Sequence, residues 1–407
     1  LLLCLGFASG LPLALTASTL SAWLAEAGVS KASIGLFAAV ATPYAFKFLW
    51  APLIDGLSLP VFCRALGRRR GWLLAVQLAL MAALVFLGLA DPAVNPFFTA
   101  LMAVIVASLS ATQDIVIDAY RVEILTPEEQ GAGAAVTVFG YRLGMIASSA
   151  GALYLADALG WQMAYLAMAS LMLFGLAATL FAKEPSSAVD MSPLAPRRSS
   201  LAAWLREHVV APFADFMTRD HWLAVLLFIV LYKFADAFMG VMTNPFLLEI
   251  GFSKSEIASV VKLYGLAATI IGSFIGGAMV FRMGVIRPLW ICGIAHGLTN
   301  LMFVVQAHVG ADIHILALGI TLENLSGGMG TAAFVAYLSS LTHLRFTATQ
   351  YALLSSFAAF GRTWLSTPAG WFAETLGWEW FFVLATCLAI PGLAVLGWLQ
   401  KKSPRPA

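Results

Sequence analysis

The chain has 407 residues, of which 61% are hydrophobic and only 11% are charged, and its formal net charge is +2. Soluble domains carry roughly 25% charged residues, so this composition excludes a water-soluble fold. The small net charge gives no indication of a nucleic-acid partner. The sequence contains no Walker motif, Ser/His/Asp order or metal-ligand cluster, so it gives no indication of an enzyme, a cofactor or a bound metal.

Apolar segments long enough to cross a membrane follow one another along the whole chain. A helix needs about 20 apolar residues to span the hydrocarbon core. With turn signals as boundaries, the sequence predicts an all-α polytopic membrane protein with twelve transmembrane helices. These spans are expected at 1–24, 34–54, 72–89, 97–120, 132–156, 161–181, 222–248, 257–281, 289–307, 313–341, 350–374 and 378–399.

A long polar stretch, rich in Pro, Ser and Arg, separates the sixth span from the seventh. This composition is typical of a linker, and its segment 201–216 is expected to form a short helix at the membrane interface. The predicted domains are an N-terminal six-helix bundle at 1–183, a linker at 184–220, and a C-terminal six-helix bundle with a short tail at 221–407.

Two short motifs recur at the same places in the two halves. WLAEAGVSKASIG at 23–35 returns as FLLEIGFSKSEIA at 246–258, where the first and seventh spans end. ADALGWQ at 156–162 returns as AETLGWE at 373–379, before the sixth and twelfth spans. Two matches at equivalent positions indicate an internal repeat. Two parallel six-helix, pseudo-symmetric halves resemble the major facilitator architecture, in which substrate binds between halves that rock.

The distribution of the 23 Lys and Arg residues predicts the orientation. The even-numbered loops and the C-terminal tail hold most of them, whereas the odd-numbered loops hold only Lys31 and Lys254. Because cytoplasmic loops retain positive charge, both termini are expected in the cytoplasm.

Charged residues inside the spans are the main candidates for function, because each costs at least about 2.5–3.5 kcal/mol at the bilayer centre. Spans three, six, nine and twelve, which face lipid in the major facilitator arrangement, contain none near their middle, and the only charged residue in these four ranges is Glu379 at the very start of span twelve. Structural ion pairs between helices remain an alternative for every one of these residues. The set comprises Lys47, Asp114, Asp118, Arg142, Lys233, Asp236, Lys262, Glu323 and Arg362.

Helical spacing refines this set in the first half. Asp114, Asp118 and Arg121 follow i, i+4, i+7 and therefore share one helix face. Arg142 lies at a depth similar to that of Asp114 on the next, antiparallel helix, so we expect these two residues to pair in at least one state.

In the second half, Lys233 and Asp236 stand one helical turn apart and could neutralise each other. FGR at 360–362 echoes FGYR at 139–142 and suggests that Arg362 is equivalent to Arg142. A carboxyl group that changes its surroundings between states could couple proton flow to transport, and Asp236 or Glu323 are the candidates. His296 in span nine is interpreted as a satisfied packing residue.

Three segments carry a family resemblance: GFASGLPLALTASTLSAWL at 6–24, ATPYAFKFLWAPLID at 41–55 and ATQDIVIDAYR at 111–121. They resemble the AmpG-type muropeptide permeases of the major facilitator superfamily, and the resemblance covers essentially the whole chain. The QD-x-x-x-D core is also similar to the acetyl-coenzyme A transporter family. In the superfamily's loop signature, an acid is closely followed by Gly and Arg residues, but here an insertion separates Asp55 from Gly67 and Arg68.

The resemblance implies proton-driven import of N-acetylglucosaminyl-1,6-anhydro-N-acetylmuramyl peptides across a bacterial inner membrane, which serves cell-wall recycling and influences β-lactamase induction. The expected partners are this anionic glycopeptide, protons and membrane lipids, and the protein is expected to be a monomer. The candidates for substrate binding are Gln113, Tyr120, Arg142, Tyr232, Lys233, Asn244, Lys262, Asn324 and Arg362. The candidates for proton coupling or gating are Lys47, Asp114, Asp118, Arg121, Asp236 and Glu323. The alternatives are a carrier of another anion, such as acetyl-coenzyme A, and a membrane sensor that binds muropeptide without moving it.

Overall fold

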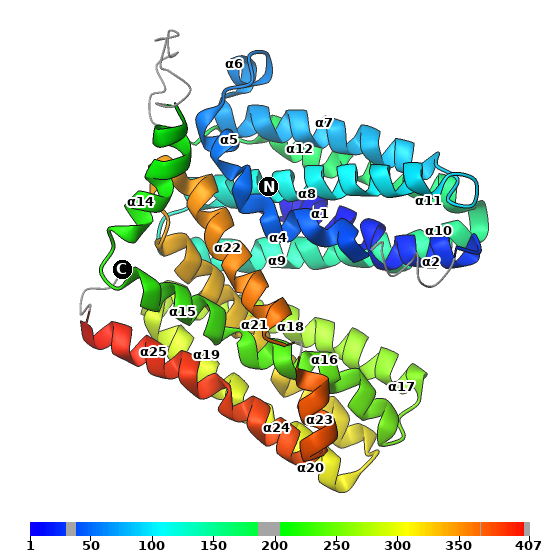
Figure 1. Ribbon diagram of the computed structural model, residues 1–407, viewed down its shortest axis with the longest axis vertical. Helices are drawn as coiled ribbons and strands as arrows, with labels where there is room; N and C mark the ends of the chain where they lie inside the picture. The colour runs from blue at the N-terminus through cyan, green and yellow to red at the C-terminus, as the bar shows by residue number, and fades with distance from the viewer. Residues whose placement is uncertain (30–37, 186–203, 367, 403–407) are drawn as a thin grey trace. The chain divides into compact units, whose positions relative to one another are not determined.

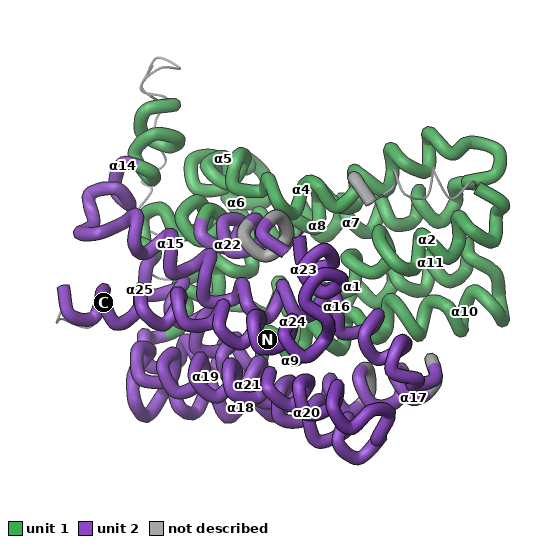
Figure 2. The backbone as a smooth tube through the Cα atoms, turned by 60° about the horizontal axis from the view of Figure 1, so that its bottom comes forward, with its two compact units in different colours: residues 1–125, 136–213, 342–353 green, residues 126–135, 214–341, 354–407 purple. Residues whose placement is uncertain are grey.

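The computed structural model describes residues 1–29, 38–185, 204–366 and 368–402, and these described residues form helices and turns without a strand. The prediction of an all-α fold is therefore confirmed. Packing divides the chain into two compact units (Figure 2). Unit 1 consists of Leu1–Leu125, Val136–Phe213 and Thr342–Leu353, and unit 2 of Thr126–Ala135, Ala214–Leu341 and Leu354–Ala407.

Unit 1 is a bundle in which α8 packs against both α1 and α7, while α11 and α12 pack against α7 (Figure 1). Its elements from the N-terminus are α1 (Leu2–Thr16), α2 (Ser18–Glu26), η1 (Ala38–Ala41), α4 (Thr42–Phe46), η2 (Lys47–Leu49), α5 (Ala51–Gly56), α6 (Phe62–Leu66), α7 (Arg68–Gly88) and α8 (Pro96–Ile124). They continue with most of α9 (Gln130–Ile146), η3 (Ala147–Gly151), α10 (Ala152–Leu159), α11 (Trp161–Leu171), α12 (Leu173–Phe181), η4 (Arg206–Val210), the first residues of α14 (Ala211–Met217), η6 (Leu344–Phe346) and the beginning of α22 (Thr347–Trp364).

In unit 2, α21 packs against both α18 and α19, and α25 packs along α15 (Figure 1). Its elements are α15 (Trp222–Tyr232), α16 (Phe234–Glu249), α17 (Lys254–Ile257), η5 (Ala258–Tyr264), α18 (Gly265–Met283), α19 (Ile286–Thr299), α20 (Leu301–Val309), α21 (Ile313–Ser340), the rest of α22, α23 (Ala369–Leu376), α24 (Trp378–Cys387) and α25 (Ala389–Lys402).

Among the described residues, eight helical stretches are long and apolar enough to cross a membrane. They are Leu2–Glu26, Arg68–Gly88, Pro96–Ile124, Trp161–Phe181, Trp222–Glu249, Ser259–Met283, Ile286–Val309 and Trp378–Lys402. The other four expected spans correspond to α4 with α5, α9 with α10, α21, and α22 with α23. Three of these are interrupted, and α21 carries a glutamate, an asparagine and several glycines near its middle.

Prolines account for the interruption of the second span, because proline cannot donate a backbone hydrogen bond inside a helix. Pro43 and Pro52 stand in the first turns of the short helices α4 and α5, where the missing donor costs least. Pro12 and Pro245, by contrast, lie inside α1 and α16, and both helices continue past them. Span seven is also broken at Lys233, which joins α15 to α16 with φ −104° and ψ 4°. This break places a charged side chain at a discontinuity of the helix.

Both repeated motifs form matching turns in their own units. Gly28 and Gly251 have positive φ values of 75° and 108°, and each ends a helix with the same two bonds. The glycine N–H bonds to the carbonyl three residues back, and the next N–H to the carbonyl five residues back, as in a Schellman motif. Gly160 and Gly377 likewise share φ values of 84° and 74°. The internal repeat is therefore confirmed at these turns.

Aromatic packing repeats in the same way. The ring centroids of Trp23 and Trp161 lie 5.8 Å apart, and those of the corresponding Phe246 and Trp378 lie 5.2 Å apart. In each unit an aromatic residue from the first repeated motif thus packs on the tryptophan that follows the glycine of the second motif. The two motifs recur together because they contact each other within each half.

The second copy of the first motif also begins a new helix. Glu256 accepts hydrogen bonds from the Ser253 hydroxyl at 2.6 Å and from the Ser253 backbone N–H at 2.8 Å. In return, the Ser253 hydroxyl accepts from the Glu256 N–H at 3.2 Å, which completes a capping box. The bonds from Ser253 lower the pKa of the Glu256 carboxyl below its ordinary value. The serine and glutamate of this motif therefore serve the turn itself.

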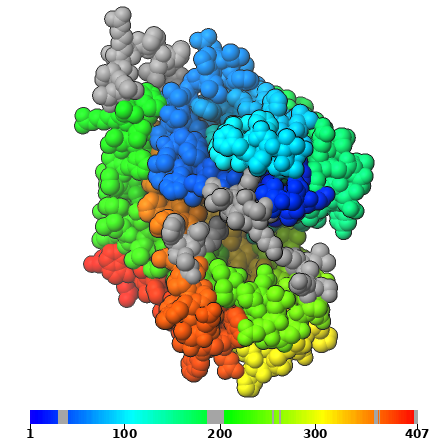
Figure 3. All heavy atoms as spheres, turned by 45° about the vertical axis from the view of Figure 1, so that its right-hand side comes forward, coloured from blue at the N-terminus to red at the C-terminus, as the bar shows by residue number. Residues whose placement is uncertain are grey.

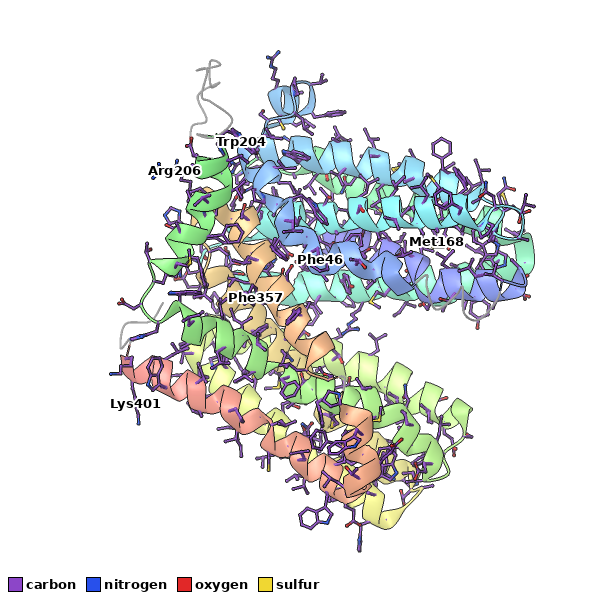
Figure 4. The ribbon with its side chains drawn as sticks, viewed as in Figure 1. Phe46, Met168, Trp204, Arg206, Phe357 and Lys401 are labelled. Carbon is purple, nitrogen blue, oxygen red and sulfur yellow. The ribbon has the colours of Figure 1, made fainter. Side chains whose placement is uncertain are left out.

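Side chains fill the spaces between the helices of each unit (Figure 3). Met168 on α11 is buried at 3% exposure in the apolar core of unit 1, whereas Phe46 on α4 is 49% exposed (Figure 4). Phe86 on α7 and Phe181 on α12 are 55% and 86% exposed. Large exposed apolar side chains on uncharged stretches of helix are typical of a surface that faces lipid.

Candidate functional site

A cluster of charged residues lies along α8 in unit 1. The Asp114 carboxylate accepts a hydrogen bond from the Ser9 hydroxyl on α1 at 2.5 Å. One turn further, Asp118 lies 4.0 Å from Lys47 Nζ and 3.7 Å from Arg121 Nη2. These three α8 residues therefore share one helix face, as expected, and Lys47 from the second span lies beside that face.

Arg121 is almost fully buried, although it is a permanent cation. Its guanidinium carbon lies 5.3 Å from the centre of the Tyr351 ring on α22, in a part of that helix that belongs to unit 1. A cation over an aromatic face in a desolvated site is stabilised by about 2 kcal/mol or more. Arg121 thus stabilises the packing of α8 against the beginning of α22.

Arg142 does not pair with Asp114 in this structure, where the carboxylate bonds to Ser9 instead. Among the described residues, no ion pair joins Arg142 to an acid, and its Nε is buried without a hydrogen-bond partner. A buried donor of this kind costs about 1–3 kcal/mol. The Asp114 to Arg142 pair stays a prediction for another conformational state.

A second buried network in unit 1 is centred on Arg69, which is fully buried at the start of α7. Its guanidinium bonds to Asp55 Oδ1 at 2.9 Å and to both Glu123 carboxylate oxygens from Nε at 3.0 Å. The other Asp55 oxygen accepts from the backbone N–H and the hydroxyl of Thr349, each at 2.8 Å. Despite the insertion that separates them in sequence, Asp55 and the arginine run therefore meet, and Asp55 binds the first turn of α22.

The ends of the linker are attached to the same region of unit 1. The Glu184 carboxylate accepts from the backbone N–H groups of Arg69 and Arg70 at 2.8 and 3.1 Å, which places an anion at the N-terminus of α7. Past the undescribed part of the linker, Trp204 and Arg206 mark a helix that continues into α14 (Figure 4), so the expected linker helix is confirmed from residue 204 onward. The Gln350 amide donates to the Pro212 carbonyl at 3.1 Å.

The corresponding cluster in unit 2 surrounds Asp236. Lys233 Nζ lies 2.9 Å from Asp236 Oδ2 and 3.5 Å from the carbonyl of Gly327, which confirms the expected pairing across one helical turn. Both side chains line a cavity within unit 2 between α16, α19, α21 and α25. A charged pair beside a cavity in a membrane helix can rearrange when water or a ligand enters.

His296 completes this cluster, and sequence analysis did not find its role. Its Nε2 lies against Asp236 Oδ1, and its Nδ1 lies 2.9 Å from the Ser326 hydroxyl. The side chain is 11% exposed and lines the same cavity. The interpretation of His296 as a packing residue was incomplete, because its partners come from α16 and α21. A histidine in an otherwise uncharged span was the available signal.

Glu323 and Asn324 lie three and two residues before Ser326 on α21. The Asn324 amide donates to Glu323 at 2.6 Å, and its oxygen accepts from Thr269 on α18 at 2.9 Å. Glu323 also interacts electrostatically with His296, Asp236 and Lys233. The structure thus brings both candidate coupling acids into one cluster.

Other predicted binding residues have backbone partners here. Gln113 donates to the Ala8 carbonyl at 2.9 Å, Tyr120 to that of Lys183 at 2.8 Å, and Tyr232 to that of Leu289 at 3.1 Å. Asn244 is exposed on α16. The side chains of Lys262 and Arg362 lie outside the described residues.

Comparison with known proteins identifies the family to which the chain belongs. Residues 2–362 match the family model described as Major Facilitator Superfamily. The chain is similar to the anhydromuropeptide permease of Escherichia coli K12, with 44% identity over 97% of this chain and 78% of that protein. It is also similar to the putative transporter AmpG 4 of Rickettsia felis, with 36% identity over 98% of this chain and 95% of that protein.

Solved structures show the same fold at low sequence identity. The proton:xylose symporter XylE aligns with a TM-score of 0.68 and 13% identity over 98% of this chain and 94% of that one. The human organic anion transporter MFSD10 aligns with a TM-score of 0.66 and 15% identity over 97% and 96%. The alignments cover nearly the whole of each chain, so they confirm the fold expected from the repeat.

Proposed function

Because this chain belongs to the major facilitator superfamily and, within it, to the AmpG-type permeases, we propose that it imports anhydromuropeptides by alternating access. The observation that carries the proposal is the 44% identity to the Escherichia coli anhydromuropeptide permease over 97% of the chain. The chain is a multi-pass membrane transporter, and the proposed setting is a bacterial inner membrane with both termini in the cytoplasm. We propose that it works as a monomer among membrane lipids, without a cofactor.

The polar residues support a glycopeptide substrate in chemical terms. Sugars are bound by amide and aromatic side chains, and peptide carboxylates by Lys or Arg. Arg142 has a buried Nε without a partner, Asn244 is exposed, and Lys233 lines a cavity, so these residues have capacity for a ligand. We also propose Gln113 and Tyr120 as binding residues, whose hydrogen bonds to backbone carbonyls are replaced by bonds to the substrate during transport. Tyr232, Asn324, Lys262 and Arg362 complete the proposed set.

We further propose that uptake is coupled to inward proton movement. Two clusters support this part, one around Asp114 and Asp118 in unit 1 and one around Asp236 and Glu323 in unit 2. Each cluster holds carboxylates whose partners change if its helices move, and such a change alters proton affinity. Lys47 and Arg121 belong to the first cluster as gating partners.

The proposed domain boundaries are those of the repeat: 1–183, the linker at 184–220, and 221–407. The compact units follow packing instead, so that residues 342–353 are grouped with unit 1 and 126–135 with unit 2. The motif pairs at Gly28 and Gly251, and at Gly160 and Gly377, support the repeat boundaries.

The test is uptake of radiolabelled N-acetylglucosaminyl-1,6-anhydro-N-acetylmuramyl tripeptide into liposomes that contain only this protein. We expect saturable uptake that an inward proton gradient stimulates and that unlabelled muropeptide competes away. Acetyl-coenzyme A at the same concentration should not compete.

The matched control pair is Arg142→Gln beside Arg287→Gln, an exposed arginine at the start of α19. We expect the first change to lower uptake at least tenfold and the second to leave it unchanged. Competition by acetyl-coenzyme A alone would favour a carrier for another anion. Binding without any uptake would favour a sensor, and either result would contradict the proposal.

A further inference from the structure

The cavity in unit 2 is bordered by a chain of polar groups from three helices. Asp236 on α16 has one oxygen bonded to Lys233 Nζ at 2.9 Å and the other in contact with His296 Nε2 on α19. His296 Nδ1 lies 2.9 Å from the Ser326 hydroxyl on α21. The imidazole therefore bridges a carboxylate and a hydroxyl, with the cavity beside it.

The fold holds this ring in place from both sides. A Cβ atom at Gly327 would lie 3.2 Å from His296 Cε1, so the glycine next to Ser326 leaves the space that the ring occupies. The Ser326 hydroxyl also lies 2.9 Å from the Glu323 carbonyl and 3.0 Å from the Thr299 hydroxyl. The serine thus has one hydrogen to donate and more than one acceptor within reach.

The charged and titratable groups around His296 come from three parts of unit 2. From the α15–α16 segment come Tyr232, Lys233 and Asp236, from α21 comes Glu323, and α19 itself supplies Cys292. The part of α25 that lines the cavity is apolar. With His296 neutral, Lys233 balances Asp236, and a proton on His296 adds one positive charge close to both Asp236 and Glu323. Histidine is the side chain that most readily changes charge near neutral pH.

We propose that His296 binds and releases the coupling proton in unit 2, an assignment that rests on the proton-coupled transport proposed above. With His296 neutral, Nε2–H donates to Asp236 and Nδ1 accepts from the Ser326 hydroxyl. When a proton from water in the cavity binds Nδ1, the new N–H donates to Ser326 Oγ. The Ser326 hydrogen then turns to the Glu323 carbonyl. Asp236 stays ionised and stabilises the imidazolium, in competition with Lys233.

The experiment measures two activities of the full-length protein in liposomes. One is muropeptide accumulation driven by a proton gradient, and the other is muropeptide counterflow at equal pH on both sides. We expect His296→Gln to keep counterflow within about twofold and to lose gradient-driven accumulation at least tenfold. Accumulation in this variant should also lose its dependence on external pH between 5.5 and 8. His308→Gln is the matched control, because His308 is an 83% exposed histidine of the same unit.

Ser326→Ala provides a second, milder variant if His296→Gln folds poorly. It removes the acceptor of the charge-assisted bond from protonated Nδ1, so the pH profile of uptake should move toward lower pH with both activities retained. An unchanged pH profile in Ser326→Ala would overturn the proposal. So would a folded His296→Gln variant that keeps gradient-driven accumulation, or one that loses both activities together. Failure of the wild-type protein to take up muropeptide, or to respond to the gradient, would instead refute the proposed function.

Discussion

The buried bonds of Asp55 allow a quantitative prediction for Asp55→Asn. The Asp55 side chain is 2% exposed, and its carboxylate accepts three hydrogen bonds, one from Arg69 at 2.9 Å and two from Thr349 at 2.8 Å. The amide keeps a single acceptor oxygen, so it loses either the bond from Arg69 or both bonds from Thr349, and the bonds that remain are no longer charge-assisted. The buried Arg69 guanidinium also loses one of its two counter-charges, and because breaking one partner of a buried charge pair costs about 3–5 kcal/mol, the free energy of unfolding should fall by about that amount.

The assay is equilibrium unfolding of the purified protein in mixed micelles. Asp91→Asn is the matched control, because Asp91 lies in an exposed turn, where its carboxylate accepts from the backbone N–H groups of Ala93 and Val94. We expect a loss of less than 1 kcal/mol there. Thr349→Val removes the hydroxyl but keeps the backbone N–H, and should cost about 1.5–3 kcal/mol.

A double-mutant cycle between Asp55→Asn and Thr349→Val tests whether the two residues act as a unit. We expect a coupling energy of about 1–2 kcal/mol, because the hydroxyl has no charged acceptor left once Asp55 is neutral. Additive losses, or an Asp55→Asn effect no larger than that of the exposed control, would refute the reasoning.

Three further predictions concern single features of the fold. Asp114→Asn and Arg142→Gln should each lower transport, and a combined loss smaller than the sum would indicate that they pair in another state; purely additive losses in a double-mutant cycle would contradict this. Gly160→Ala should lower the free energy of unfolding by about 1–2 kcal/mol because φ is 84°, whereas Gly151→Ala has open space and helical φ and should be neutral or slightly stabilising in the same unfolding assay. Glu207→Gln removes the ion pair with Arg345, whose two side chains are 57% and 56% exposed, so the free energy of unfolding should fall by less than about 1 kcal/mol. A larger loss in thermal unfolding would contradict this prediction.

Local patterns in the sequence account for the features that were predicted correctly. Lys233 and Asp236 pair because residues three apart share a helix face whatever surrounds the helix. The glycine turns recur because the repeated motifs place a residue that tolerates positive φ directly after a helix. Such features depend on neighbours in the chain, so the sequence states them directly.

The functional clusters depend on contacts that no local pattern specifies. The interpretation of His296 as a packing residue missed its acidic partner, because Asp236 lies on another helix, 60 residues earlier in the chain. The bond between Asp55 and Thr349 joins residues separated by 294 positions. Asp114 is expected to pair with Arg142 in at least one state, and in this structure its carboxylate bonds to Ser9 on α1.

By itself, the sequence determined that this protein crosses a membrane as a helical repeat with charges on a subset of its spans. Hydropathy and short motifs suffice for that, because each helix satisfies its own backbone bonds in an apolar environment. Only the tertiary structure decided which partner each buried charge meets. That choice depends on the rotation and register of packed helices, which small differences in side-chain shape determine and hydropathy does not encode.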